Sequence, residues 1–207
     1  MLYDYLQKNY DANQPIFLAD IELPGISDMN LRKQIKTLCD NNKLMRYDTG
    51  VYYLPATSHL KNASVLAPGT VAQYKYINRK GKTEGYYSGY TFANQIGLTT
   101  QVPFTLEIVT NQEKMNYRKV DIKGQQIVLR KPRTKVTAEN AIILQLLDLL
   151  KDISNYTDIE TADAAKKVQA FTQNNRITRA QIDEYIPLFP DKTYRNLYEM
   201  RLYNVFT

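Results

Sequence analysis

Hydrophobic residues near the start of the chain recur at the spacing of helices. Four of them predict a short amphipathic helix: Leu2, Tyr5, Leu6 and Tyr10. Residues 16–21 form a second apolar element, and a third helix is predicted for residues 28–41. In that third helix Leu31, Ile35 and Leu38 form one stripe, which we expect to be buried, with Ser27 or Asp28 as its N-cap.

Two short strand patterns follow the third helix. Residues 43–47 and 51–54 are apolar and β-prone, and Asp48-Thr49-Gly50 between them suits a hairpin turn. Three helices followed by a hairpin within about 60 residues is typical of a winged helix. We therefore predict a winged-helix domain over residues 1–60, with a weakly patterned linker over residues 56–64.

The rest of the chain predicts a mixed domain over residues 61–207. Its elements are expected as a helix from 68 to 77, a strand or turn at 85–89, a helix at 90–96, strands at 105–110, 117–122 and 126–130, and helices at 137–153, 159–173, 178–186 and 191–204. A turn at Lys123-Gly124 joins the last two strands, so a small antiparallel sheet is predicted within about 85–131, and 137–207 is helical. Thr137 is the expected cap of a helix that is apolar around most of its circumference and therefore buried. The predicted fold class is α+β.

The composition removes several classes of function. Of the 207 residues, 43% are hydrophobic, and no apolar run reaches the roughly 18 residues of a membrane span. Cys39 and His59 are single residues of their types, which excludes an internal disulfide framework and leaves zinc too few ligands. The start of the chain lacks the pattern of a signal peptide. We therefore expect a cytoplasmic protein with no cofactor, no metal and no membrane partner.

Charge is concentrated in the middle of the chain. Residues 1–60 hold 6 basic and 7 acidic residues, residues 61–135 hold 13 and 4, and residues 136–207 hold 8 and 10. A segment of net charge +9 between two nearly neutral ends favours a polyanionic partner. The competing interpretation is a solvated basic surface without a partner.

In a winged helix the 28–41 helix enters the major groove of DNA, and the hairpin contacts the backbone or minor groove. On this interpretation Asn30, Lys33 and Thr37 meet base edges, and Arg32 and Lys36 meet phosphates. The predicted contacts of the hairpin and of the basic run 129–135 are Arg46, Tyr47, Thr49, Arg130, Lys131, Arg133 and Lys135. The alternatives are a protein-interaction module and, for the basic run, a solvated loop.

The stretch from Gly85 to Pro103 combines tyrosines, glycines and small hydroxyl side chains. It matches neither a P-loop nor a dinucleotide fingerprint, because the glycine spacing is wrong and no Gly-Lys-Ser/Thr follows. Its tyrosines suit either stacking on bases or a place in the core.

A metal-dependent nuclease is a further alternative. Glu107, Asp121 and Lys123 form the carboxylate-plus-lysine set that such an enzyme needs. Strand alternation predicts that Glu107 and Asp121 point to the solvated side of their sheet, where carboxylates bind metal weakly. We therefore expect no enzyme and no catalytic residue.

Several segments of residues 1–150 resemble the AbiEi-type antitoxin regulators of bacteria and phage-defence loci. They are 16–21, 31–46, 50–55, 87–103, 108–111, 129–132 and 139–140. The resemblance implies a winged helix that represses the operon of a toxin–antitoxin pair, bound to double-stranded operator DNA. It also implies a C-terminal domain that counteracts a nucleotidyltransferase-like toxin. Residues 151–207 carry no match, and an antitoxin that binds only protein remains the rival.

Overall fold

The structure is a computed structural model that describes residues 2–56 and 66–204. It divides into two compact units, Met1–Val71 and Ala72–Thr207. The predicted domain boundary at residue 60, most of the predicted linker and His59 lie outside the described residues. Within the described ranges, no helix is long and apolar enough to cross a membrane.

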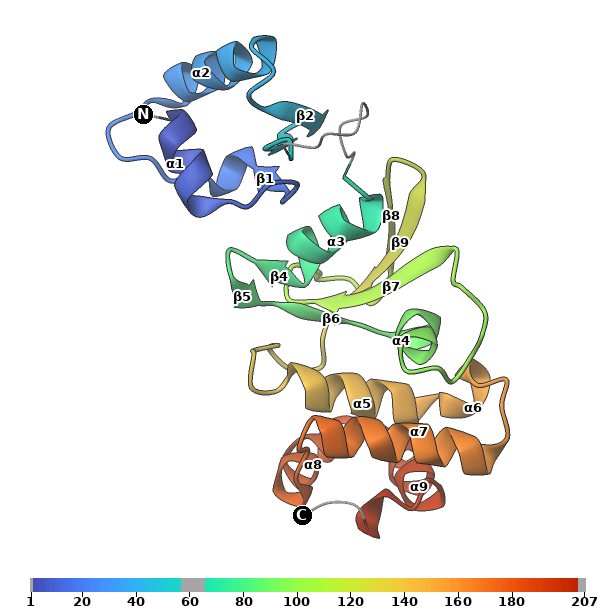
Figure 1. Cartoon of the computed structure of the whole chain (residues 1–207). Helices are drawn as coiled ribbons and strands as arrows, with labels where there is room; N and C mark the ends of the chain where they lie inside the picture. Colours follow the sequence, from blue (N-terminus) through green and yellow to red (C-terminus); the bar gives the residue numbers. More distant parts are fainter. Residues whose placement is uncertain (1, 57–65, 205–207) are drawn as a thin grey trace. The chain divides into compact units, whose positions relative to one another are not determined.

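The N-terminal unit has the element order of a winged helix (Figure 1). Its elements are α1 (Leu2–Asn9), β1 (Ile16–Phe17), the 3-10 turn η1 (Leu18–Asp20), α2 (Asp28–Asp40), β2 (Met45–Asp48) and β3 (Val51–Tyr53). The strands form an antiparallel sheet of order β1-β3-β2. The second apolar element is therefore a strand and one 3-10 turn, not a regular helix. Ile16 pairs with Tyr52, and the Leu18 N–H donates to the Gly50 carbonyl at 2.8 Å, so these backbone groups serve the sheet.

One hydrophobic cluster holds the N-terminal unit together. Its buried members come from α1, from β1 and the segment after it, from α2 and from the ends of the hairpin: Leu2, Leu6, Ile16, Ile21, Leu31, Ile35, Leu44 and Leu54. The predicted stripe of α2 thus faces this core, with Leu38 partly buried at its edge. Ser27 is the N-cap, and its Oγ accepts a hydrogen bond from the Asn30 N–H at 3.4 Å.

The C-terminal unit is a mixed sheet followed by helices. In chain order the elements are α3 (Pro68–Tyr76), which crosses the division, β4 (Asn78–Arg79), β5 (Lys82–Thr83), β6 (Gly85–Tyr87), α4 (Gly89–Gln95), β7 (Thr105–Thr110), β8 (Arg118–Ile122), β9 (Gln125–Arg130), α5 (Ala141–Lys151), α6 (Ile153–Tyr156), α7 (Thr161–Asn174), α8 (Arg179–Tyr185), η2 (Ile186–Leu188), α9 (Asp191–Glu199) and η3 (Leu202–Asn204). The predicted α+β class, with small antiparallel pairings and C-terminal helices, is confirmed.

The main sheet has the order β6-β7-β9-β8. β6 pairs with β7 and β8 with β9 in antiparallel fashion, whereas β7 and β9 are parallel. After β7 the chain forms β8 at the edge of the sheet and then β9, which lies between β7 and β8. The hairpin predicted from the turn at Lys123-Gly124 is therefore joined to β7 through β9, which runs parallel to it. The β4–β5 hairpin was not predicted.

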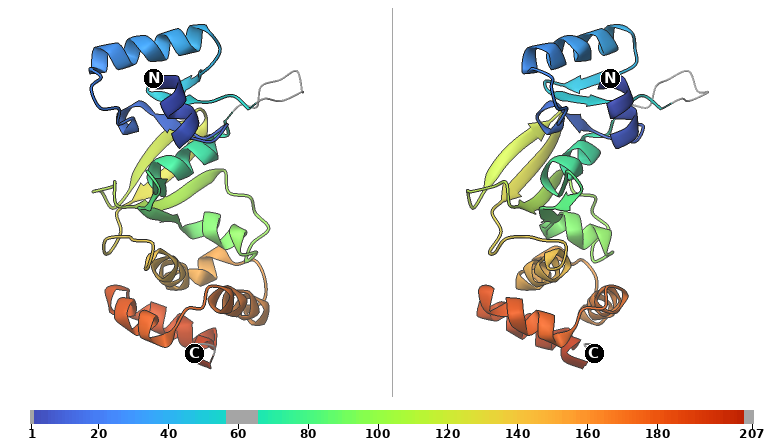
Figure 2. Two further views of the ribbon diagram at one scale, coloured as in Figure 1. Left: turned by 60° about the vertical axis from the view of Figure 1, so that its left-hand side comes forward. Right: turned by 90° about the vertical axis from the view of Figure 1, so that its left-hand side faces the viewer.

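α5 lies in the middle of the unit. The sheet and α4 are on one side of it, and α7, α8 and α9 are on the other (Figures 1 and 2). Its Leu144, Leu146 and Leu147 are fully buried, which confirms that this apolar helix organises the core. The helix begins at Ala141, not after Thr137. The Asn140 side chain accepts from the Thr137 N–H at 2.8 Å and donates to the Lys135 carbonyl at 3.0 Å, which makes residues 137–140 a turn.

Candidate functional site

The outward face of α2 is free of the core. Leu31 and Ile35 are 7% and 3% exposed, whereas all five predicted DNA contacts of the helix are exposed: Asn30, Arg32, Lys33, Lys36 and Thr37. The helix therefore presents three cations and two hydrogen-bonding side chains together.

The two uncharged side chains of this face keep free hydrogen-bonding capacity. The Asn30 Oδ1 accepts from the Gln34 side chain at 3.4 Å, which leaves the two N–H donors of the Asn30 amide for a ligand. The Thr37 hydroxyl donates to the Lys33 carbonyl at 3.1 Å, so its oxygen remains an acceptor. These side chains match the groups displayed on base edges in the major groove.

The hairpin, which would be the wing, presents two of its three predicted contacts. Arg46 and Thr49 are exposed, and the Arg46 guanidinium donates to the Thr49 hydroxyl at 3.4 Å. Tyr47 is only 4% exposed, because alternation along β2 turns it away from the side of Arg46 and Asp48. Tyr47 therefore does not lie on the surface where the predicted DNA contact requires it.

Two further residues of α2 bear on what this helix can do. Met29 is 83% exposed on the side of α2 away from the core, and it was not among the predicted contacts. An apolar side chain at this position can contact the methyl group of thymine. Cys39 is half-buried, and burial raises the pKa of its thiol, which opposes formation of the thiolate that a nucleophile requires.

The predicted basic contacts of the C-terminal unit differ in their surroundings. Arg130 ends β9 and forms an ion pair with Glu107, with 2.7 Å between Nη2 and Oε2. The Arg133 guanidinium donates to the Leu188 carbonyl at 3.0 Å and lies over the Phe189 ring. The side chains of Lys131 and Lys135 are exposed. The run is therefore partly fixed by the fold rather than an extended solvated loop.

The residues of the nuclease alternative do not come together. Glu107 lies beside Val128 and Asp121 beside Gln126, on opposite sides of β9. Asp121 accepts from the Gly124 N–H and the Gln126 side chain, and Glu107 is 14% exposed in its ion pair, so the expected solvated position of Glu107 is wrong. Across the described ranges, no three His, Cys, Asp or Glu side chains are grouped as metal ligands would be.

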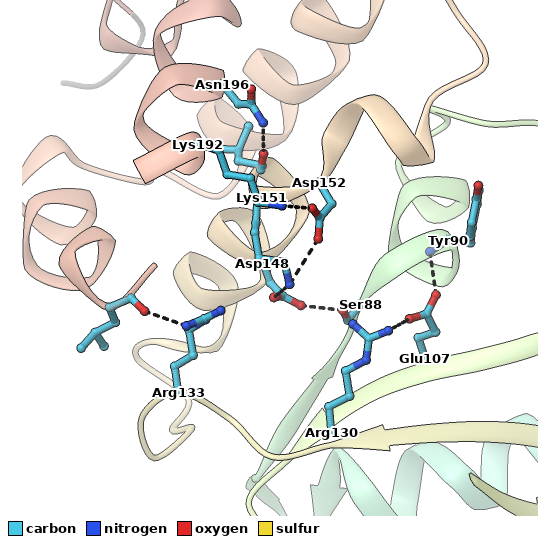
Figure 3. A network of polar contacts seen from close by, with 12 residues as sticks. Ser88, Tyr90, Glu107, Arg130, Arg133, Asp148, Lys151, Asp152, Lys192 and Asn196 are labelled. Carbon is cyan, nitrogen blue, oxygen red and sulfur yellow. Dashed lines mark hydrogen bonds and ion pairs between the residues drawn. The ribbon is translucent and has the colours of Figure 1, made fainter. Parts of the chain in front are cut away.

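A polar network links the sheet to α5 (Figure 3). The Ser88 hydroxyl donates to Asp148 at 2.6 Å, and Lys151 contacts Asp148 at 2.9 Å and Asp152 at 3.5 Å. Lys192 of α9 also pairs with Asp152. This network was not predicted from the sequence, because its members lie up to about a hundred residues apart and share no motif.

The tyrosine-rich stretch 85–103 contributes to both the core and the surface. Tyr86 is 5% exposed, and burial, with the nearby Asp148 carboxylate, raises the pKa of its hydroxyl well above the ordinary value. Phe92 and Leu98 are also core residues, whereas Tyr90 is 39% exposed. Most of the stretch therefore has a structural role, and Tyr90 is accessible to a ligand.

Comparison with known families gives one finding. A family model described as a family of unknown function, DUF6088, matches residues 10–180. No curated protein matches the chain.

Proposed function

We propose that this chain, which belongs to the DUF6088 family of unknown function, is a DNA-binding autorepressor and antitoxin of a toxin–antitoxin or phage-defence module. The proposal places α2 in the major groove of an operator and the β2–β3 hairpin against the DNA backbone. The partners are double-stranded operator DNA and a nucleotidyltransferase-like toxin, in the cytoplasm. No residue is given a covalent or acid–base role.

The observation that carries the proposal is the division of α2 into two faces. One face is fixed in the hydrophobic core, and the opposite face exposes Lys33, Lys36 and Asn30 together with Arg46 of the hairpin. A helix that is held rigidly on one side can hold its polar side chains in register with base edges. The resemblance of residues 1–150 to AbiEi-type regulators supports the same assignment.

The proposal is tested by fluorescence anisotropy of the full chain with the DNA upstream of its own gene and with random duplex. Asn30→Ala and Lys33→Ala should each cost about 1–3 kcal/mol on the operator and little on random DNA. Arg46→Ala should weaken binding to both, because a backbone contact carries no sequence information.

Lys8→Ala is the matched control, since Lys8 is an exposed cation at the end of α1 in the same unit. It should leave both affinities unchanged. Equal binding of operator and random duplex by the wild type, or operator affinity untouched by the α2 substitutions, would contradict the proposal. If no duplex binds, the rival antitoxin that contacts only protein takes its place.

A further inference from the structure

The C-terminal unit contains a basic cavity that the proposed function does not use. Its volume is about 620 Å³, within the range of roughly 300–1,000 Å³ that small-molecule sites occupy. Among the described residues that line it are four cations, Arg130, Lys131, Arg133 and Lys151, and one carboxylate, Asp148. This excess of positive charge in a concave site favours an anionic ligand.

Three of the four cations of this cavity are held in position by the fold. Figure 3 shows Arg130 coming from β9, Arg133 from the segment after it and Lys151 from α5. Arg130 is fixed by Glu107, Arg133 by the Leu188 carbonyl and the Phe189 ring, and Lys151 by Asp148. Each guanidinium has five N–H donors and uses one in these contacts, so both arginines can still bind a phosphate group.

The partners of these cations do not neutralise the site. When Glu107, Asp152 and Lys192 are counted with the lining residues, five cations stand against three carboxylates. Because the arginine and Lys151 donors are already ordered, less side-chain entropy is lost when a ligand binds.

A second cavity, of about 450 Å³, shares Arg130 with the first. Three aromatic side chains line it, and they remain accessible: Tyr90 at 39%, Phe104 at 77% and Tyr117 at 52%. Exposed aromatic faces beside a cation are the features on which nucleobases stack. The two cavities thus place an anion-binding end and an aromatic end on either side of one arginine.

We propose that the C-terminal unit binds a mononucleotide. The phosphate lies among Arg130, Lys131, Arg133 and Lys151, and the base lies against Tyr90, Phe104 and Tyr117. This site is independent of the α2 interface, since every residue of both cavities belongs to the second compact unit.

Isothermal titration calorimetry of the full chain with four probes tests the proposal: AMP, ribose 5-phosphate, adenosine and a single-stranded oligonucleotide. AMP should bind at least tenfold more tightly than ribose 5-phosphate or adenosine, because it alone fills both ends. Its affinity should fall as salt is raised. Tighter binding of the oligonucleotide than of AMP would overturn the proposal in favour of a nucleic-acid strand.

Two kinds of variant separate the two ends. Lys131→Glu should weaken AMP and ribose 5-phosphate by at least tenfold each, and because Lys131 is exposed the fold should be retained. The double variant Phe104→Ala/Tyr117→Ala should weaken AMP while leaving ribose 5-phosphate unchanged.

The matched control is Lys166→Ala, at an exposed cation of α7 outside both cavities, and it should change nothing. AMP binding that is absent at millimolar concentration, or that is unaffected by Lys131→Glu, would refute the site.

Discussion

At the scale of single residues, Gly89 controls the approach of Glu107 to Arg130. Gly89 has φ of +55°, and a Cβ at this position would lie 2.2 Å from the Glu107 Oε1. The same carboxylate accepts from the Tyr90 N–H at 3.3 Å and pairs with Arg130. A side chain at residue 89 would therefore displace a largely covered ion pair as well as strain the backbone.

Gly89→Ala should destabilise the fold by more than the strain of a left-handed conformation, which is about 1–2 kcal/mol. Gly124→Ala is the matched control, because Gly124 has φ of +87° but nothing within 4 Å of its Cβ position. Urea unfolding of both variants isolates the effect of the carboxylate. Equal losses of stability would show that Glu107 moves aside without cost.

Glu113 is a residue whose stabilising effect depends on pH. Burial acts to raise its pKa, but hydrogen bonds from the Met115 and Lys114 N–H groups and from Arg118 outweigh it and hold the pKa below the ordinary 4.5. A carboxyl group whose pKa is lowered in the folded state stabilises the fold at pH values above its ordinary pKa. That contribution is lost as pH falls through the folded-state pKa.

Glu113→Gln should therefore reduce the free energy of unfolding by about 1.5–3 kcal/mol at neutral pH, the magnitude of hydrogen bonds to a charged group. The difference between wild type and variant should shrink as pH is lowered below 4.5. Denaturant unfolding at a series of pH values measures both. A difference that is constant with pH would mean that the carboxylate charge has no part in the effect.

At the scale of elements, the helices of the C-terminal unit differ in how their ends are satisfied. α8 begins with a capping box, in which the Thr178 Oγ1 accepts from the Gln181 N–H and the Gln181 Oε1 accepts from the Thr178 N–H. α7 instead follows Glu160, which makes no side-chain cap bond. The cap of α8 holds the helix that places Ile182 in the core.

Thr178→Ala should lower the free energy of unfolding by about 1 kcal/mol, since an N–H at the helix start loses its acceptor. Thr178→Ser should retain most of the stability, because the hydroxyl is kept. Thr161→Ala, at the exposed first residue of α7, serves as a control and should have little effect. If Thr178→Ser destabilises as much as Thr178→Ala, the methyl group rather than the cap is responsible.

At the scale of the whole molecule, positive charge is concentrated in residues 61–135, with 13 basic and 4 acidic residues. The structure divides the predicted phosphate contacts of the C-terminal unit into two kinds. Arg130, Lys131 and Arg133 line the basic cavity, whereas the exposed Lys135 does not. Lys135 is therefore the residue that tests an additional contact with operator DNA without disturbing the cavity.

Lys135→Ala should lower the slope of log affinity against log salt for operator binding by about 0.9, the effect of one lost phosphate contact. The exposed Lys166, which pairs with Asp163 at 2.9 Å, provides the control, and its replacement by alanine should leave the slope unchanged. If the slope is unchanged in Lys135→Ala, Lys135 makes no phosphate contact, and the positive charge of residues 61–135 does not serve operator binding at this position.

The sequence by itself determined those features that depend on neighbouring residues. The stripe of Leu31 and Ile35 defined α2 and its outward face, and the apolar character of residues 141–151 defined a buried helix. The turn at Lys123 and Gly124 defined the β8–β9 hairpin. Each of these follows from periodicity or turn chemistry, which a single segment displays whatever it packs against.

Only the tertiary structure decided which segments meet. Periodicity shows that a face is buried but not what covers it, so the parallel pairing of β7 with β9 and the covered position of Glu107 could not be predicted. Residues 16–17 became a strand because β3 supplied partners for their backbone groups, and the Leu18 N–H that follows donates to the Gly50 carbonyl. The basic cavity likewise depends on contacts across the fold, such as Arg133 with Leu188, 55 residues apart. Such contacts leave no local pattern in the sequence.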